Sequence, residues 1–193
     1  MGTPSTRTSD AAAFPARRSA CRIAEHVTEG QWLGNGSPYV TYGPDLEPVA
    51  AEEMPLLINR LLRLREEIAG WADTLDGATR DATVAGSSRS NRAILLHVLG
   101  PTGAYLSPVL GTIAGISRLQ TAAERGQVEI AEALRQATSL VVERLRSVTA
   151  EERSNVIQRP KEIRTLRKAL RRMLEHDWEH LVELSRRPGG PKL

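Results

Sequence analysis

The chain has 193 residues, of which 40% are hydrophobic, 25% charged and 4% aromatic, and its formal net charge is +3. This length accommodates one ordinary domain or one domain with an extension, and the single cysteine, Cys21, excludes an internal disulfide and every multi-cysteine zinc module. Because no run of roughly eighteen consecutive apolar residues is present, we expect no membrane-spanning helix and place the protein in the reducing cytoplasm.

Residues 1–45 are expected to form an N-terminal extension that is partly disordered or irregular. Residues 1–22 are rich in Ser, Thr, Ala and Arg. This composition is typical of a transit peptide, but a disordered bacterial leader is the simpler interpretation. A short helix over 17–33 is weakly patterned. Glycines and prolines between residues 32 and 48 exclude a long helix and indicate a linker or an irregular packed arm.

Two amphipathic helices are predicted after the extension. The first has apolar residues at three- and four-residue spacing, and Asp76–Gly77 ends it. Its apolar stripe consists of Met54, Leu57, Ile58, Leu61, Leu64, Ile68, Trp71 and Leu75. The second helix begins near Ser88 or Ser90, either of which suits an N-cap. It contains the apolar run 94–99, and Gly100–Pro101 kinks or interrupts it.

Two more helices are predicted in the C-terminal half. An apolar stripe indicates the third helix over 127–148, and residues 149–152 carry a capping-box pattern for a short extra turn. A longer stripe indicates the fourth helix over 163–187. With no convincing strand, residues 46–187 are predicted to form an all-α, up-down four-helix bundle, followed by a tail over 188–193.

His176 and His180 lie four residues apart on the fourth predicted helix. Their imidazoles therefore project from the same side, with Cβ atoms roughly 6 Å apart, and two imidazoles at this spacing can share one metal ion. They flank the apolar stripe, which is where a pair lining a cleft would lie. The alternative is a chance pair on a solvated helix, which is common.

His97 is the third histidine of the helical region. It lies within the apolar run of the second helix, where periodicity does not fix its direction and a buried polar side chain needs a partner. The alternative to a metal ligand is a core histidine bonded to a backbone carbonyl or to Tyr105. Three histidines from two helices, with positions left for water or substrate, are typical of a catalytic metal site. His26 lies outside the bundle and receives no role.

Asp177 follows His176 directly and falls near the centre of the apolar stripe. The segment from His176 to His180 resembles the His-Glu-x-x-His helix of metalloproteases. No histidine follows His180 to supply the third ligand of such proteases, so we do not expect a protease. Asp177 either orients a ligand imidazole or accepts a proton near the metal, and a buried bond to a neighbouring helix is an equal alternative.

Three segments carry a likeness to a known family. They are RTLRKALRRMLEHDWEHL (164–181), ILLHVLG (94–100) and GAYL (103–106). The first resembles the last helix, and the other two the second helix, of the DinB-like (DinB/YfiT) superfamily of bacterial metalloproteins, with the likeness extending over about 46–187. The resemblance implies a four-helix bundle whose metal is held by His97, His176 and His180.

The resemblance also implies a thiol-dependent enzyme, either a mycothiol-like S-transferase or a related isomerase or lyase. Its cofactors would be a divalent transition metal, zinc or nickel, which both suit imidazole, and a low-molecular-weight thiol. The metal would activate a thiolate, a water or a carbonyl. Asp177, Tyr105 and Thr102 are candidates for proton transfer or substrate orientation, and Arg167 and Arg171 for binding the carboxylates of the thiol.

Two positions depart from the commoner family pattern. Pro101–Thr102 stands where relatives often have an acid, and Arg164 stands where many have a tryptophan. Both positions are expected near the pocket. These differences therefore affect which reaction the resemblance implies more than they affect the metal ligands.

Two alternatives belong to other functional classes. The basic run 159–172 would suit a nucleic-acid-binding helical protein, but most of its cations point away from the apolar stripe, as on a solvated face, and the low aromatic content disfavours stacking on single strands. The other alternative is a non-catalytic metal-binding bundle, such as a stress or resistance protein. The expected partner is a small-molecule substrate, and a homodimer stays open.

Overall fold

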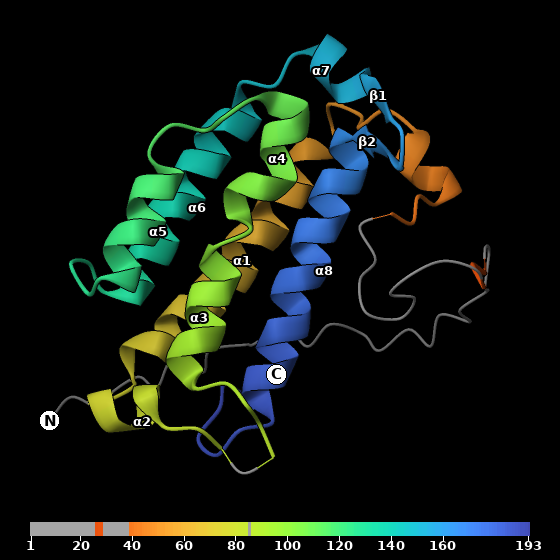
Figure 1. Ribbon diagram of the computed structural model, residues 1–193. Helices are drawn as coiled ribbons and strands as arrows, with labels where there is room; N and C mark the ends of the chain where they lie inside the picture. Colours follow the sequence, from red (N-terminus) through yellow and green to blue (C-terminus); the bar gives the residue numbers. More distant parts are fainter. Residues whose placement is uncertain (1–25, 29–38, 85) are drawn as a thin grey trace, which may run out of the picture.

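The computed structural model describes residues 26–28 and 39–193, except residue 85, and these residues are mostly helical (Figure 1). The long helices are α1 (Met54–Asp73), α3 (Asn91–Leu99) followed directly by α4 (Thr102–Leu110), α6 (Ile130–Arg146) and α8 (Leu166–Ser185). The shorter elements are the 3-10 helix η1 (Gly43–Leu46), α2 (Gly77–Asp81), α5 (Ile116–Glu124), α7 (Ala150–Ser154), β1 (Val156–Arg159) and β2 (Glu162–Thr165).

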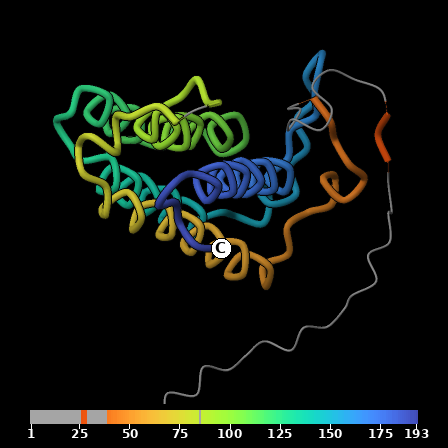
Figure 2. Tube along the Cα trace, turned by 90° about the horizontal axis from the view of Figure 1, so that it is seen from below, coloured from red at the N-terminus to blue at the C-terminus, as the bar shows by residue number. Residues whose placement is uncertain are grey.

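Helix α8 lies between two other parts of the bundle. It packs against α1 on one side and against α3 and α4 on the other, as Figure 2 shows. Helix α1 also packs against α6, and α5 lies along α6. The prediction of a helical fold is therefore confirmed, and α8 is placed so that its side chains meet both α1 and α3.

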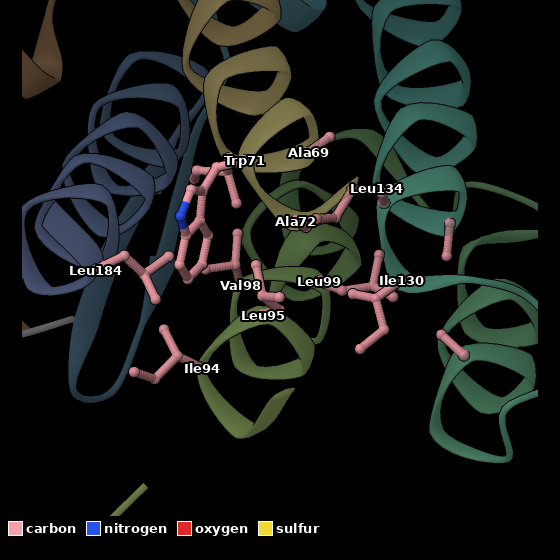
Figure 3. Close-up of a cluster of buried hydrophobic side chains, with 14 of the residues drawn as sticks. Ala69, Trp71, Ala72, Ile94, Leu95, Val98, Leu99, Ile130, Leu134 and Leu184 are labelled. Atoms are coloured by element: carbon pink, nitrogen blue, oxygen red, sulfur yellow. The ribbon is translucent and has the colours of Figure 1, made fainter. Parts of the chain in front are cut away.

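The core consists of two apolar clusters along the bundle. One cluster joins the ends of α1, α3, α6 and α8, and Figure 3 shows the Trp71 indole of α1 among Val98 of α3 and Leu184 of α8. The other cluster lies nearer α4 and the start of α8, and includes Leu106 and Leu170. Each fully buried leucine contributes about 1.5–3 kcal/mol by leaving water, so the packing of α3 against α8 is firmly held.

The local signals at the start and end of α3 act as the sequence indicated. The Ser90 hydroxyl accepts a hydrogen bond from the Ala93 amide at 3.2 Å, so Ser90 caps the helix. Helix α3 ends at Leu99, and α4 begins at Thr102 after Gly100–Pro101. The interruption expected there is confirmed, because proline cannot donate the hydrogen bond that would continue the helix.

The expectation of no strand is wrong for residues 156–165. Strands β1 and β2 form an antiparallel hairpin in which Val156 faces Thr165 and Arg159 faces Glu162. Residues 160–161 make the two-residue turn, and β-branched side chains on both strands favour extended backbone. The Thr165 hydroxyl then accepts a hydrogen bond from the Lys168 amide, so α8 begins at Leu166 and not at residue 163.

One helix of the structure was not expected from the sequence, and one expected helix falls mostly outside the described residues. Helix α5 was not predicted. The helix suggested over 17–33 lies outside the described residues, apart from 26–28, which form no regular element. The tail after α8 folds back on the bundle, because the Trp71 indole donates a 2.8 Å hydrogen bond to the Gly189 carbonyl.

One stretch within the described ranges, Asn91–Leu110, is long and apolar enough to cross a membrane by length and composition. This stretch consists of α3 and α4. It differs from the expectation of no membrane-spanning helix, which was based on the lack of a continuous apolar run. Ile94, Leu95, Val98 and Leu99 of this stretch are fully buried against the other helices. Such packing is consistent with a soluble protein, because the same side chains form its core.

Candidate metal centre

The structure brings His97, His176 and His180 together. His97 comes from α3, and the other two come from successive turns of α8, which packs against α3. The ring centroids are 5.1 Å apart for His97 and His176, 4.8 Å for His97 and His180, and 4.5 Å for His176 and His180. The three histidines that the sequence singled out thus form one cluster.

The nitrogen atoms of this cluster fit the requirements of a single metal ion. Metal-binding atoms of the three rings all lie within 4.8 Å of one another, and the Nε2 atoms of His97 and His176 are 3.3 Å apart. In a tetrahedral site with nitrogen ligands at about 2.1 Å, neighbouring nitrogens lie about 3.4 Å apart. The His97–His176 pair has this spacing.

The three imidazoles differ in their exposure to solvent. His176 and His180 are buried, whereas His97 is exposed. His97 is therefore not the core histidine of the alternative interpretation, although its neighbours Leu95 and Val98 are buried. The two buried histidines of the cluster lie on α8, and its exposed histidine lies on α3.

A carboxylate lies next to the Nδ1 atom of each of the two buried rings. Nδ1 of His180 lies 2.8 Å from Oε2 of Glu183, and Nδ1 of His176 lies 3.4 Å from Oδ1 of Asp177. A carboxylate on Nδ1 fixes the ring and leaves Nε2 as the metal-binding atom. We did not identify Glu183 from the sequence, although its position three residues after His180 on one helix was a usable signal.

Asp177 also forms a buried ion pair with Arg65 of α1. Its Oδ2 accepts a hydrogen bond from Arg65 Nε at 2.5 Å, and its Oδ1 accepts one from Arg65 Nη2 at 3.2 Å. The side chains of Arg65 and Asp177 are only 3% and 0% exposed. Asp177 therefore makes the buried bond to a neighbouring helix that was one of the interpretations drawn from the sequence. It also lies beside His176, and its role in orienting a ligand imidazole stays a prediction.

The surroundings of His97 and His180 favour neutral imidazoles. The partial burial of the His97 ring lowers its pKa, although the residue as a whole is exposed, and the two neighbouring histidines lower it further. Burial also lowers the pKa of His180, although the hydrogen bond with Glu183 acts in the opposite direction. Because a metal binds only the deprotonated ring, these directions keep the nitrogens available near neutral pH.

Arg89 forms an ion pair with Glu183, the carboxylate that contacts His180. Its Nη2 lies 3.0 and 2.8 Å from the two carboxylate oxygens of Glu183. Although burial raises the pKa of Glu183, its contacts with His180 and Arg89 lower that pKa overall. Glu183 therefore stays ionised while it holds the ring of His180.

The two other candidates for proton transfer lie on α4. The Tyr105 ring is 5.7 Å from the His176 ring, and burial raises the pKa of the Tyr105 hydroxyl, so the hydroxyl is protonated at neutral pH. The Thr102 side chain is buried, and its hydroxyl donates a hydrogen bond to the Val98 carbonyl at 3.4 Å. Tyr105 thus contacts the histidine cluster directly, whereas Thr102 bonds within the break between α3 and α4.

Arg167 and Arg171, the candidates for thiol binding, lie toward the start of α8. Arg167 pairs with Glu53 at 2.6 Å, and Arg171 pairs with the buried Asp45 at 2.7 Å. Arg167 precedes His176 by about two and a half turns of helix. Both arginines hold residues before α1 against the bundle.

The rest of the basic run is also engaged within the molecule. Arg164 pairs with Glu162, and Arg172 pairs with Glu175. Lys168 is buried. Arg159 and Lys161 are exposed. The partly exposed arginines of the run, Arg164, Arg167 and Arg171, are held in ion pairs. A comparison with protein families, with curated proteins and with solved structures finds no match to this chain.

Proposed function

We propose that this chain is a metalloprotein of the DinB-like type, with one divalent transition metal, zinc or nickel, held by His97, His176 and His180. The observation that carries the proposal is the convergence of three imidazoles whose buried members have carboxylates at Nδ1. One ligand comes from α3, the second of the four helices expected from the sequence, and two come from α8, the last of them. The family resemblance implies the same arrangement. Nitrogen donors of this kind suit zinc and nickel.

The exposed histidine of the cluster favours an enzyme over a storage or structural site. Three protein ligands leave coordination positions for a substrate, and His97 is exposed. A bound metal supplies a charge that lowers the pKa of a thiol or water, or polarises a carbonyl. We propose a cytoplasmic enzyme that acts on a small molecule, as a thiol S-transferase or a related isomerase or lyase.

The residues of the chain have separate tasks in this proposal. Asp177 and Glu183 orient the rings of His176 and His180, and Arg65 balances the charge of Asp177 within the bundle. The Tyr105 ring lies beside the His176 ring, and the Tyr105 hydroxyl, which burial keeps protonated, would donate a hydrogen bond or a proton to a bound substrate.

Metal analysis of the protein purified without a histidine tag tests the proposal. We expect about one zinc or nickel ion per chain in the wild type and none in the double variant His176→Ala/His180→Ala. The matched control is His26→Ala, which removes an exposed histidine outside the cluster and is expected to retain the metal. Retention of the ion by the double variant would refute the site.

A screen with small thiols tests the enzymatic part separately. Consumption of the thiol together with an electrophilic substrate should require the metal, and should be lost in the double variant but not in His26→Ala. A protein that binds the metal stoichiometrically yet turns over no thiol, carbonyl or ester substrate would support the non-catalytic alternative.

A further inference from the structure

A cavity of about 210 Å³ lies beside the histidine cluster, between α4, β2 and α8. One part of its wall is apolar and consists of Ala104, Pro108 and Val109 of α4 together with Ala169 of α8. Tyr105 also lines the cavity, and its ring contacts His176. The cavity is thus separated from the candidate metal centre by the width of one aromatic side chain.

Cationic side chains of β2 and α8 also line the cavity. Arg164, Lys168 and Arg172 line it, and the only acid there is Glu162, which pairs with Arg164. That pair is neutral as a whole. Arg172 pairs with Glu175, which lies outside the lining, so Lys168 is left as a cation of the lining that has no ion pair within the described residues.

Lys168 is a buried cation that is solvated by neutral groups. Its side chain is only about 4% exposed, and its Nζ donates to the Thr41 hydroxyl at 2.9 Å and to the Ile163 carbonyl at 3.0 Å. Among the residues that the structure describes, no carboxylate forms an ion pair with it. Burial lowers its pKa, although the charges of Glu162 and Asp45 act in the opposite direction, and an anion beside it would raise this pKa further.

Arg172 contributes a guanidinium to the same lining. Its side chain is 10% exposed, and Nη1 bonds to Glu175 at 2.9 Å. Its Nε is fully buried and has no hydrogen-bond partner within the described part of the chain. An unsatisfied buried donor on a charged group is costly, and a guanidinium presents several N–H groups that match an anionic oxygen group.

We propose that this cavity binds the anionic oxygen group of a small organic molecule through Lys168 and Arg172. The group is a carboxylate or a phosphate, since both match a guanidinium and an ammonium. The apolar wall accommodates the carbon atoms next to it, and the rest of the molecule extends past Tyr105 toward the histidines. This inference rests on the proposed function in one respect and adds a substrate class to it. Binding of the anionic group does not depend on the metal centre, whereas the orientation of the rest of the molecule toward the histidines does.

Binding of three matched probes tests the cavity. Benzoate and phenyl phosphate carry the two anionic groups on one apolar ring, and benzamide is the neutral control. Isothermal titration of the protein with EDTA present should show binding of benzoate, phenyl phosphate or both, at least about tenfold tighter than benzamide, because a hydrogen bond to a charged group is worth about 1.5–3 kcal/mol. The tighter anion identifies the group. Equal affinity of the three probes, or no binding of either anion, would overturn the proposal.

Variants locate the bound anion. Lys168→Met keeps a long side chain and removes the charge, and Arg172→Lys keeps the charge and removes the guanidinium. Each should weaken binding of the preferred anion about tenfold. The control Arg146→Met removes an exposed arginine from α6 and should leave the affinity unchanged. Ala104→Leu, at an exposed position in the wall, narrows the cavity without altering charge and should also weaken binding. Unchanged affinity in folded Ala104→Leu and Arg172→Lys would contradict the proposal.

The histidine double variant separates this proposal from the proposed function. His176→Ala/His180→Ala should bind the preferred anion as the wild type does, because neither histidine lines the cavity. If the wild type contains no metal and the anion still binds, the cavity proposal stands and the metal centre falls. If the double variant loses the anion while Lys168→Met keeps it, the anion binds at the histidines, and the cavity proposal is wrong.

Discussion

Replacing Asp177 by asparagine should destabilise the bundle strongly, because the substitution leaves Arg65 as a buried charge without a counterion. The two side chains are almost completely buried and share two hydrogen bonds. Removing one partner of such a pair costs about 3–5 kcal/mol. Asparagine keeps the shape and one acceptor oxygen, so we expect the lower end, about 3 kcal/mol.

This loss corresponds to a fall in melting temperature of about 6–12 °C, since about 1 kcal/mol shifts a domain of this size by about 2–4 °C. Chemical and thermal denaturation followed by circular dichroism would measure it, with EDTA present so that metal binding does not add to the stability of the folded state. The matched control is Glu66→Gln on α1, the helix that also carries Arg65. Its ion pair with Arg135 is exposed, so the substitution should cost less than about 1 kcal/mol.

The double variant Arg65→Met/Asp177→Asn completes the cycle. It removes both buried charges, so it should be more stable than Asp177→Asn alone. The reasoning would be refuted if Asp177→Asn cost no more than Glu66→Gln, or if removing Arg65 in addition brought no recovery. Either result would mean that the pair is not buried as the structure has it.

Two further changes test the contacts around α8. Glu183→Gln should weaken metal binding by about 10- to 100-fold in a competition with a chelator, because the amide no longer holds the His180 ring as a carboxylate does; an unchanged affinity would contradict this role. Hydrogen bonds from Arg167 and from the Ala50 amide lower the pKa of Glu53 from 4.5 to about 2. The contribution of Glu53 to stability is therefore present above about pH 4.5 and lost as the pH falls toward about 2. The NMR chemical shift of the Glu53 carboxyl carbon, followed over this range, should titrate at about 2, and a carboxyl that titrates at 4.5 would contradict the pairing.

The helices and the histidine cluster were largely predictable because their signals are local. The apolar stripes, the Ser90 cap and the Gly100–Pro101 break depend on residues close in sequence. The spacing of His176 and His180 places them on one side of any helix. The direction of His97 was not predictable, because the surrounding run is apolar nearly all round, and only the packing of α3 leaves this side chain exposed.

The hairpin and the buried charges were missed for different physical reasons. Residues 163–165 continue the apolar pattern of α8, so periodicity assigns them to the helix, whereas pairing with β1 and the Thr165 cap make them a strand. The partner of Asp177 is Arg65, 112 residues away, and a contact of that kind depends on how α1 and α8 pack. Arg65 within the apolar stripe of the first helix was the one available signal.

X-ray absorption spectroscopy of the metal-containing protein tests the central claim most directly, because it reports the ligands of the ion themselves. The account predicts three imidazole nitrogens at about 2.0–2.1 Å, with the remaining positions taken by light atoms from solvent, and loss of this signal in His176→Ala/His180→Ala. A coordination shell without imidazole, or an unchanged shell in the double variant, would contradict the claim that His97, His176 and His180 bind the metal.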